Sequence, residues 1–96
     1  AFDGACPLSP FVKPELVADI KHTEFSLMVN EELRQHGFSH DMITPVYELI
    51  AYISQIFTLQ AGDIVLTGTP EGVAALQRGD KLVLSMVGQM FETEVV

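Results

Sequence analysis

The sequence predicts a mixed α/β fold that is mainly β and contains one main helix, at about residues 44–57. Most of the chain alternates apolar and polar residues with a period of two, which is typical of strands with one buried face. Between residues 38 and 57 the period changes to that of a helix. Pro45 fits this interpretation, because proline is tolerated in the first turn of a helix. The apolar residues of this segment recur at helical spacing, at Val46, Leu49, Ile50, Ile53 and Phe57.

A β-hairpin is expected before the helix. Residues 24–29 place Phe25, Leu27 and Val29 on one face of a strand. Residues 30–32 are predicted to form the turn, and residues 33–36 the returning strand.

Three strands are expected after the helix. Gly62 lies past the predicted helix end, where glycine commonly lets the chain reverse. Residues 64–66 are wholly apolar, which predicts a short strand buried on both faces. A turn at residues 78–80 then leads into strands at residues 81–87 and 90–96, so the chain is expected to end as a meander.

Length and composition bound the possible functions. The chain has 96 residues, enough for one small domain or part of one. Its 5 Lys plus Arg against 13 Asp plus Glu give a formal net charge of −8, which excludes the basic surface that nucleic-acid binding requires. No apolar run reaches the ~20 residues of a membrane span, so no membrane partner is expected. The single cysteine, Cys6, cannot form an internal disulfide; we expect a cytoplasmic protein with Cys6 as a small buried apolar side chain.

The loop at residues 66–73 is the candidate ligand-binding segment, because it follows the predicted core strand. Gly68 lacks a side chain between two hydroxyls, so Thr67, Thr69 and nearby backbone N–H groups can point at one anionic group such as a carboxylate. The alternative is a tight turn in which both hydroxyls bond to their own backbone. No Gly-Lys-Ser/Thr sequence follows, which excludes a P-loop.

The other polar residues do not combine into a catalytic or metal site. His22, His36 and His40 lack the spacing that places two imidazoles on one helix face, so each is expected at the surface. His40 and Asp41 are not expected to face each other, because adjacent helical residues point in different directions. No serine lies in a nucleophile elbow. Turn geometry explains the two aspartates that follow a glycine, Asp63 and Asp80.

Short motifs spread over the whole chain occur in an order known from one enzyme family. The chain opens with Phe2-Asp3-Gly4-Ala5-Cys6-Pro7-Leu8, and a second motif combines Val29-Asn30-Glu31-Glu32 with Arg34-Gln35. Further motifs follow at residues 41–43, 50–54, 57–59, 62–63, 66–73 and 79–80. Together they resemble the catalytic domain of the fumarylacetoacetate hydrolase family. Two positions depart from its pattern, since Glu31 and Ala74 stand where the family usually has glycine.

The resemblance implies part of a β-roll whose divalent cation, Mg²⁺ or Mn²⁺, acts as Lewis acid and template. In the family its carboxylate ligands, and the His and Glu that activate water, precede the Phe-Asp motif and have no match here. Residues 1–96 are therefore expected to be the C-terminal part of one catalytic domain, with the N-terminal metal-binding part absent. Within this part, the resemblance assigns substrate binding to Thr69, with Thr67 and Gly68 shaping the approach, and assigns no catalytic or metal-binding residue.

The complete protein is thus expected to be a metal-dependent hydrolase that cleaves a C–C bond in a small diketo or 2-oxo acid, such as an acylpyruvate from aromatic catabolism. Isomerase and decarboxylase reactions of the same family are alternatives. A non-catalytic fragment, or one half of a split protein, is the alternative from another class. The resemblance also implies a homodimer, and the chain alone is expected to be inactive.

Overall fold

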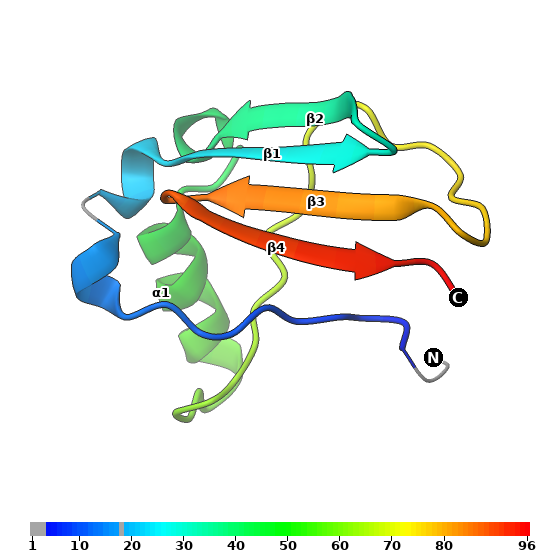
Figure 1. Cartoon of the computed structure of the whole chain (residues 1–96). Helices are drawn as coiled ribbons and strands as arrows, with labels where there is room; N and C mark the ends of the chain where they lie inside the picture. Colours follow the sequence, from blue (N-terminus) through cyan, green and yellow to red (C-terminus); the bar gives the residue numbers. More distant parts are fainter. Residues whose placement is uncertain (1–3, 18) are drawn as a thin grey trace.

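A four-stranded antiparallel sheet lies at the centre of the computed structural model, which describes residues 4–17 and 19–96 (Figure 1). The strands are β1 (Glu24–Val29), β2 (Glu32–Phe38), β3 (Lys81–Met86) and β4 (Gln89–Glu94), in the spatial order β2-β1-β3-β4. The helix α1 (Val46–Ile56) and three short 3₁₀ turns complete the fold: η1 (Pro14–Leu16), η2 (Ile20–His22) and η3 (Ser39–Asp41). The expected mainly β fold with one main helix is confirmed.

The first hairpin, β1–β2, turns through two residues with positive φ. Asn30 has φ 50° and Glu31 has φ 69°. Turns of this kind match the right-handed twist of the flanking strands and favour Asn followed by Gly. The departure at Glu31 therefore places a side chain where glycine is preferred. The predicted hairpin is confirmed, although β2 runs further than expected, to Phe38.

The second hairpin, β3–β4, docks beside the first because β3 pairs with β1. Its turn also has positive φ, 55° at Val87 and 71° at Gly88. The register of the ladders brings apolar side chains from three strands to one face of the sheet. This face includes Phe25, Leu27, Val29, Leu82, Leu84 and Phe91.

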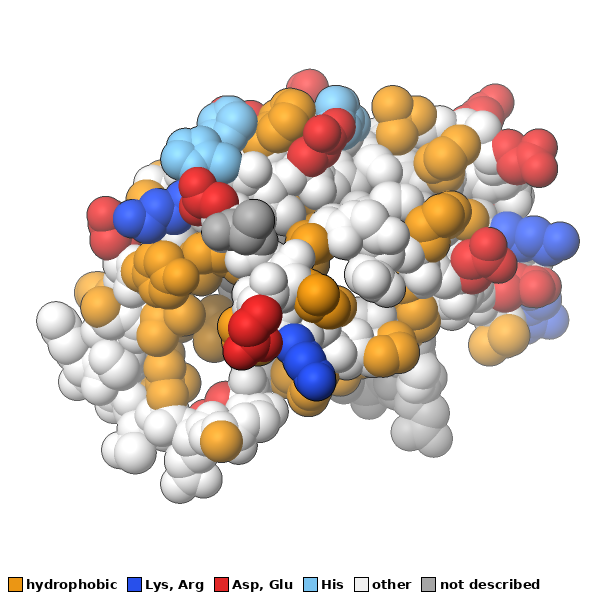
Figure 2. All heavy atoms as spheres, turned by 60° about the vertical axis from the view of Figure 1, so that its left-hand side comes forward, with side chains coloured by type: hydrophobic (Ala, Val, Ile, Leu, Met, Phe, Trp, Pro, Cys, Tyr) orange, Lys and Arg blue, Asp and Glu red, His pale blue; other side chains and the backbone are white. Residues whose placement is uncertain are grey.

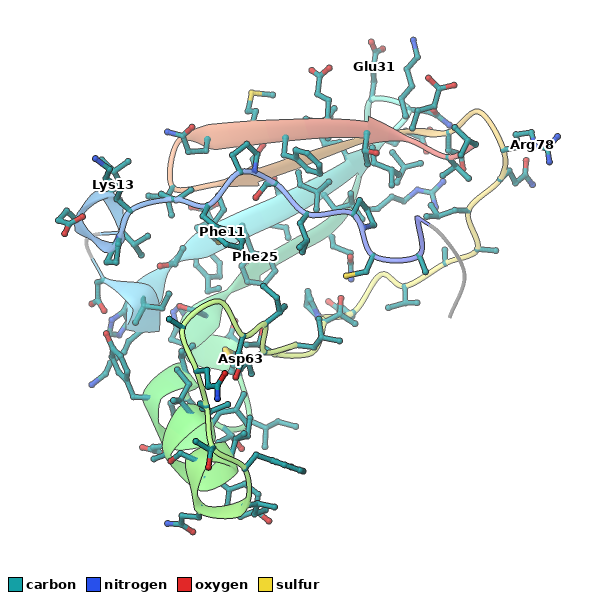
Figure 3. The ribbon with its side chains drawn as sticks, turned by 90° about the horizontal axis from the view of Figure 1, so that it is seen from below. Phe11, Lys13, Phe25, Glu31, Asp63 and Arg78 are labelled. Carbon is teal, nitrogen blue, oxygen red and sulfur yellow. The ribbon has the colours of Figure 1, made fainter. Side chains whose placement is uncertain are left out.

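The N-terminal segment and α1 lie beneath this sheet (Figure 1). Viewed from below, Phe11 of the N-terminal segment and Phe25 of β1 both lie on the underside (Figure 3). The helix begins directly after Pro45 and ends at Ile56, where the N–H of Phe57 donates to the Ile53 carbonyl over 2.9 Å. Gly62 therefore does not end the helix as expected. It lies in a separate turn in which the Asp63 carboxylate accepts from the Gln60 N–H.

Large apolar side chains are widely exposed on this chain. Among the described residues, Val29 is the only buried hydrophobic one, at 2% exposure. The accessible surface area is 7971 Å², whereas a compact monomer of this mass would expose roughly 5,500 Å². Figure 2 shows hydrophobic side chains in open patches over one face. The fold thus leaves apolar surface that its own elements do not cover.

Two expectations that depended on burial are wrong. Residues 64–66 do not form a strand, and Leu66 is 81% exposed. A strand requires a neighbour to satisfy its backbone groups, and no described segment pairs with this one. Cys6 is exposed rather than buried, because no described element covers the segment in which it lies.

In the described part of the chain, no helix combines the length and the apolar character that a bilayer crossing requires.

Candidate ligand-binding site

The loop predicted from the sequence lies along a hollow of about 720 Å³ beside β2. Thr67, Gly68 and Thr69 all line this hollow, so the structure places the three predicted site residues together. The rest of the lining comes from β1, β2, the segment before α1, and α1 itself, and it mixes apolar side chains with the polar ones of His36, Asp41 and Thr44. Its apolar side chains include Phe25, Met42, Ile43 and Leu49. A concave site with an apolar wall and a few polar groups is the usual form of a small-molecule site.

Gln35 of β2 joins this loop to the sheet. Its side-chain Nε2 donates to Thr69 Oγ1 over 2.8 Å and to the Pro70 carbonyl over 3.0 Å. The Glu71 carbonyl lies 3.4 Å from the same nitrogen. Thr69 Oγ1 thus accepts a hydrogen bond from a side chain of the sheet rather than from a backbone group of its own loop.

Close backbone packing holds the loop against the same strand. A Cβ atom on Gly72, which has φ 101°, would lie 2.1 Å from the carbonyl oxygen of Arg34. A Cβ on Gly37 would lie 2.9 Å from the ring of Phe25 and 3.4 Å from Pro70. Only glycine permits the approach at Gly72, which therefore sets the distance between the loop and β2, whereas Gly37 leaves room for the Phe25 ring.

Gly68 has the opposite surroundings. Its φ is 88°, and a Cβ atom built there would meet no atom within 4 Å. Open space therefore adjoins the backbone between the two threonines. This is the space into which a ligand carboxylate could approach the loop.

The histidines lie at the surface, as expected. Each has an acidic neighbour, and His36 Nε2 lies 2.5 Å from Glu24 Oε1. His22, Phe38 and His40 form a chain of aromatic rings, in which Phe38 and His40 stack at 5.1 Å. Figure 2 shows histidines beside carboxylates along the upper rim of one face.

His40 and Asp41 form no acid–base pair, as expected, although their side chains approach more closely than the sequence suggests. His40 Nε2 and Asp41 Oδ1 lie 3.5 Å apart, because these residues sit in the short turn η3 rather than in a regular helix. The distance is too long for a hydrogen bond between these atoms. Both side chains are largely exposed, so this contact defines no acid–base pair.

No group of three or more His, Cys, Asp or Glu side chains within residues 4–17 and 19–96 is placed to hold a metal ion. The described residues thus do not fit the divalent cation that the family implies. Asp3, in the opening motif with Phe2, lies outside the described residues.

Two aspartates have structural roles that explain their lowered pKa values. The Asp80 carboxylate accepts from the Gln77 N–H over 2.9 Å and from Asn30 Nδ2 over 2.9 Å, and these bonds lower the pKa of Asp80. Hydrogen bonds from His22 and from the Lys21 N–H lower the pKa of Asp19. A second hollow, of about 480 Å³, is lined by Asp19 and His22 but contains none of the loop residues.

Comparison with known proteins identifies the family. The whole chain, residues 1–96, matches the model of the C-terminal region of fumarylacetoacetate (FAA) hydrolase. It is 50% identical to the oxaloacetate tautomerase YcgM of Escherichia coli (strain K12), over 100% of this chain and 44% of that protein. The chain belongs to the fumarylacetoacetate hydrolase family, which confirms the resemblance seen in the sequence.

Solved structures agree with this assignment. The maleylpyruvate hydrolase of Sphingobium sp. SYK-6 superimposes with a TM-score of 0.94 at 35% identity, over 100% of this chain and 37% of that one. The fumarylpyruvate hydrolase of Pseudomonas aeruginosa, in complex with Mn²⁺ and pyruvate, superimposes with a TM-score of 0.77 at 38% identity, over 83% of this chain and 35% of that one. The chain spans less than half the length of these relatives.

Sequence reasoning did not single out Gln35 as a site residue. Its side chain reaches a loop 34 residues away, and neither periodicity nor composition encodes a contact of that separation. The one available signal was its place in the Arg34-Gln35 motif, which marked the position without explaining it.

Proposed function

We propose that the complete protein is an enzyme acting on a small 2-oxo acid, and that the loop at residues 67–69 binds the substrate carboxylate. The observation that carries this proposal is the placement of Thr67, Gly68 and Thr69 on one wall of the hollow, with open space beside the Gly68 backbone. Hydroxyls and exposed backbone groups suit an anionic ligand. The apolar side chains of the lining, such as Phe25 and Leu49, suit the carbon skeleton of a small acid.

The family supports two reactions on such an acid. The family resemblance implies hydrolysis of a C–C bond in an acylpyruvate, and the structural relatives include maleylpyruvate and fumarylpyruvate hydrolases. The higher identity to an oxaloacetate tautomerase favours interconversion of keto and enol forms as the main activity. We therefore propose tautomerisation of a 2-oxo acid as the first candidate and acylpyruvate hydrolysis as the second. Binding the carboxylate at Thr69 serves both.

A divalent cation is part of this proposal, and a fumarylpyruvate hydrolase of the family binds Mn²⁺. When bound, such an ion supplies Lewis-acid polarisation of the 2-oxo acid oxygens. As the family resemblance implies, we propose that its ligands precede the Phe2-Asp3 motif, and the described residues contain no group that could hold it. The chain by itself should then be inactive.

The test compares both reactions in the full-length protein. Oxaloacetate tautomerisation and acylpyruvate hydrolysis would be measured after metal removal and after addition of Mg²⁺ or Mn²⁺. The variant Thr69→Val removes the hydroxyl, and Thr58→Val makes the same change at an exposed position outside the hollow. We expect Thr69→Val to lower kcat/KM roughly 10- to 100-fold, since a hydrogen bond to a charged group contributes about 1.5–3 kcal/mol. Equal activity of the two variants would contradict the proposed site.

A further inference from the structure

We propose that Gln35 is a positioning residue that fixes the direction in which the Thr69 hydroxyl donates its proton. This inference rests on the proposed function, because it explains how the loop presents a donor to a carboxylate. It concerns a residue of the sheet that does not line the hollow itself.

The orientation of the Gln35 amide follows from its neighbours. The carbonyl oxygens of Pro70 and Glu71 lie 3.0 and 3.4 Å from the amide, and a carbonyl oxygen can only accept. The amide nitrogen must therefore face the loop, since the amide oxygen would be repelled there. The NH₂ group offers two hydrogens, and its two shortest contacts are Thr69 Oγ1 and the Pro70 carbonyl.

This orientation determines the role of the threonine. A hydroxyl has one hydrogen to donate and two lone pairs that accept. Because Gln35 donates to Thr69 Oγ1, one lone pair is occupied and the hydroxyl hydrogen is directed elsewhere. An acceptor in the hollow, such as a carboxylate, is the partner that this arrangement favours.

The strand gives this contact its rigidity. Gln35 is half-buried in β2 and pairs with Leu27 of β1, next to an irregularity in the register. The contact between Gly72 and the Arg34 carbonyl holds the loop to the same stretch of strand. The Gln35 amide is thus held in place before a ligand binds, so binding should cost little conformational entropy of this side chain and the loop.

Two variants separate the polarity of Gln35 from its shape. Gln35→Met keeps a side chain of similar length but removes both hydrogens. Gln35→Glu replaces the donor by an acceptor, which would draw the Thr69 hydrogen away from the hollow. Gln55→Glu adds the same charge at an exposed position on α1 and is the matched control. Pyruvate is the probe, and its dissociation constant would be measured by calorimetric titration of the full-length protein.

At neutral pH we expect Gln35→Met to bind pyruvate about tenfold more weakly than the wild type, and Gln35→Glu more weakly still, with Gln55→Glu unchanged. As the pH is lowered, the carboxyl group introduced by Gln35→Glu gains a proton and can donate again. The pyruvate dissociation constant of Gln35→Glu should then approach that of the wild type. The ratio between Gln35→Met and the wild type should stay constant. A merely structural role of Gln35 would make this recovery follow a rise in the thermal unfolding temperature of Gln35→Glu over the same pH range, whereas the positioning role predicts recovery of pyruvate binding without such a rise.

The outcomes distinguish this inference from the function on which it rests. If Gln35→Met and Gln35→Glu both bind pyruvate within about twofold of the wild type while Thr69→Val does not, the positioning role is wrong and the site stands. If Thr69→Val also binds normally, the proposed carboxylate site is wrong and Gln35 has nothing to position. Thermal unfolding of each variant shows that it is folded; should Gln35→Glu fail this check, Gln35→Met decides the question.

Discussion

Gln35 Nε2 and Thr69 Oγ1 lie 2.8 Å apart although 34 residues separate them in the chain. This contact joins the edge strand β2 to the loop that carries the predicted site residues. The hydrogen bond fixes this loop, which has no regular secondary structure, in the position where it lines the hollow. The local structure around this contact, and the surface that surrounds it, can be tested by substitution.

Gly72→Ala should undock the loop from β2. The new Cβ would lie 2.1 Å from the Arg34 carbonyl oxygen, which no adjustment of a side chain can relieve. Gly62→Ala is the matched control, because Gly62 has a similar φ of 92° and nothing within 4 Å of its Cβ position. We expect Gly62→Ala to cost about 1 kcal/mol, as positive φ alone requires, and Gly72→Ala clearly more. Urea denaturation of the full-length protein measures both, and equal costs would contradict the packing described.

Glu31→Gly should stabilise the protein. Glu31 has φ 69° in the turn between β1 and β2, a conformation that costs a residue with a side chain about 1 kcal/mol relative to glycine. The free energy of unfolding should rise by about that amount. Glu32→Gly is the control, because Glu32 lies in β2, where glycine weakens a strand. If both substitutions destabilise, the turn does not have this geometry.

Stability should fall as the solution is acidified, through Asp80 and Asp19. Their pKa values lie below the ordinary 3.8 in the folded protein, because hydrogen bonds stabilise the carboxylates. A group with a depressed folded pKa contributes stability above its unfolded pKa and loses it as the pH falls through the folded one. The loss should thus appear below about pH 4 in unfolding experiments. Asp80→Asn should flatten this decline, while Glu94→Gln, which removes a charge outside the network, should not.

The isolated 96-residue chain should self-associate. Phe11, Phe57 and Leu66 are 76%, 66% and 81% exposed, and large apolar patches promote association in water. Sedimentation should show oligomers at micromolar concentration. The double variant Phe57→Ser with Leu66→Ser should associate less than the wild type, whereas Thr58→Ser should change nothing. A monodisperse, cooperatively unfolding monomer would contradict this account of the surface.

The elements with local signals could be predicted from the sequence. Helical periodicity located the start of α1 within about two residues, and alternation located all four strands of the sheet. The predictions that were wrong concerned features that depend on contacts with other segments of the chain. Residues 64–66 have the composition of a buried strand, but a strand forms only where a neighbour pairs with it. Burial of Cys6 failed for a similar reason, because composition does not say what covers a side chain.

In the candidate site too, features with a local sequence signal could be predicted and long-range contacts could not. Thr67, Gly68 and Thr69 could be singled out because the sequence holds two hydroxyls around a glycine after an apolar run. The contacts that hold them, from Gln35 and past Gly72, are long-range and become visible only in the folded chain. The 3.5 Å approach of His40 to Asp41 likewise depends on the short turn η3, for which the sequence has no periodic signal.

The most direct test is a crystal structure of the full-length protein with pyruvate and Mn²⁺ bound. We predict that the pyruvate carboxylate accepts a hydrogen bond from Thr69 Oγ1, while Gln35 Nε2 remains bonded to the same threonine oxygen. A carboxylate bound elsewhere, with the Thr69 hydroxyl facing solvent or donating to its own loop, would contradict it.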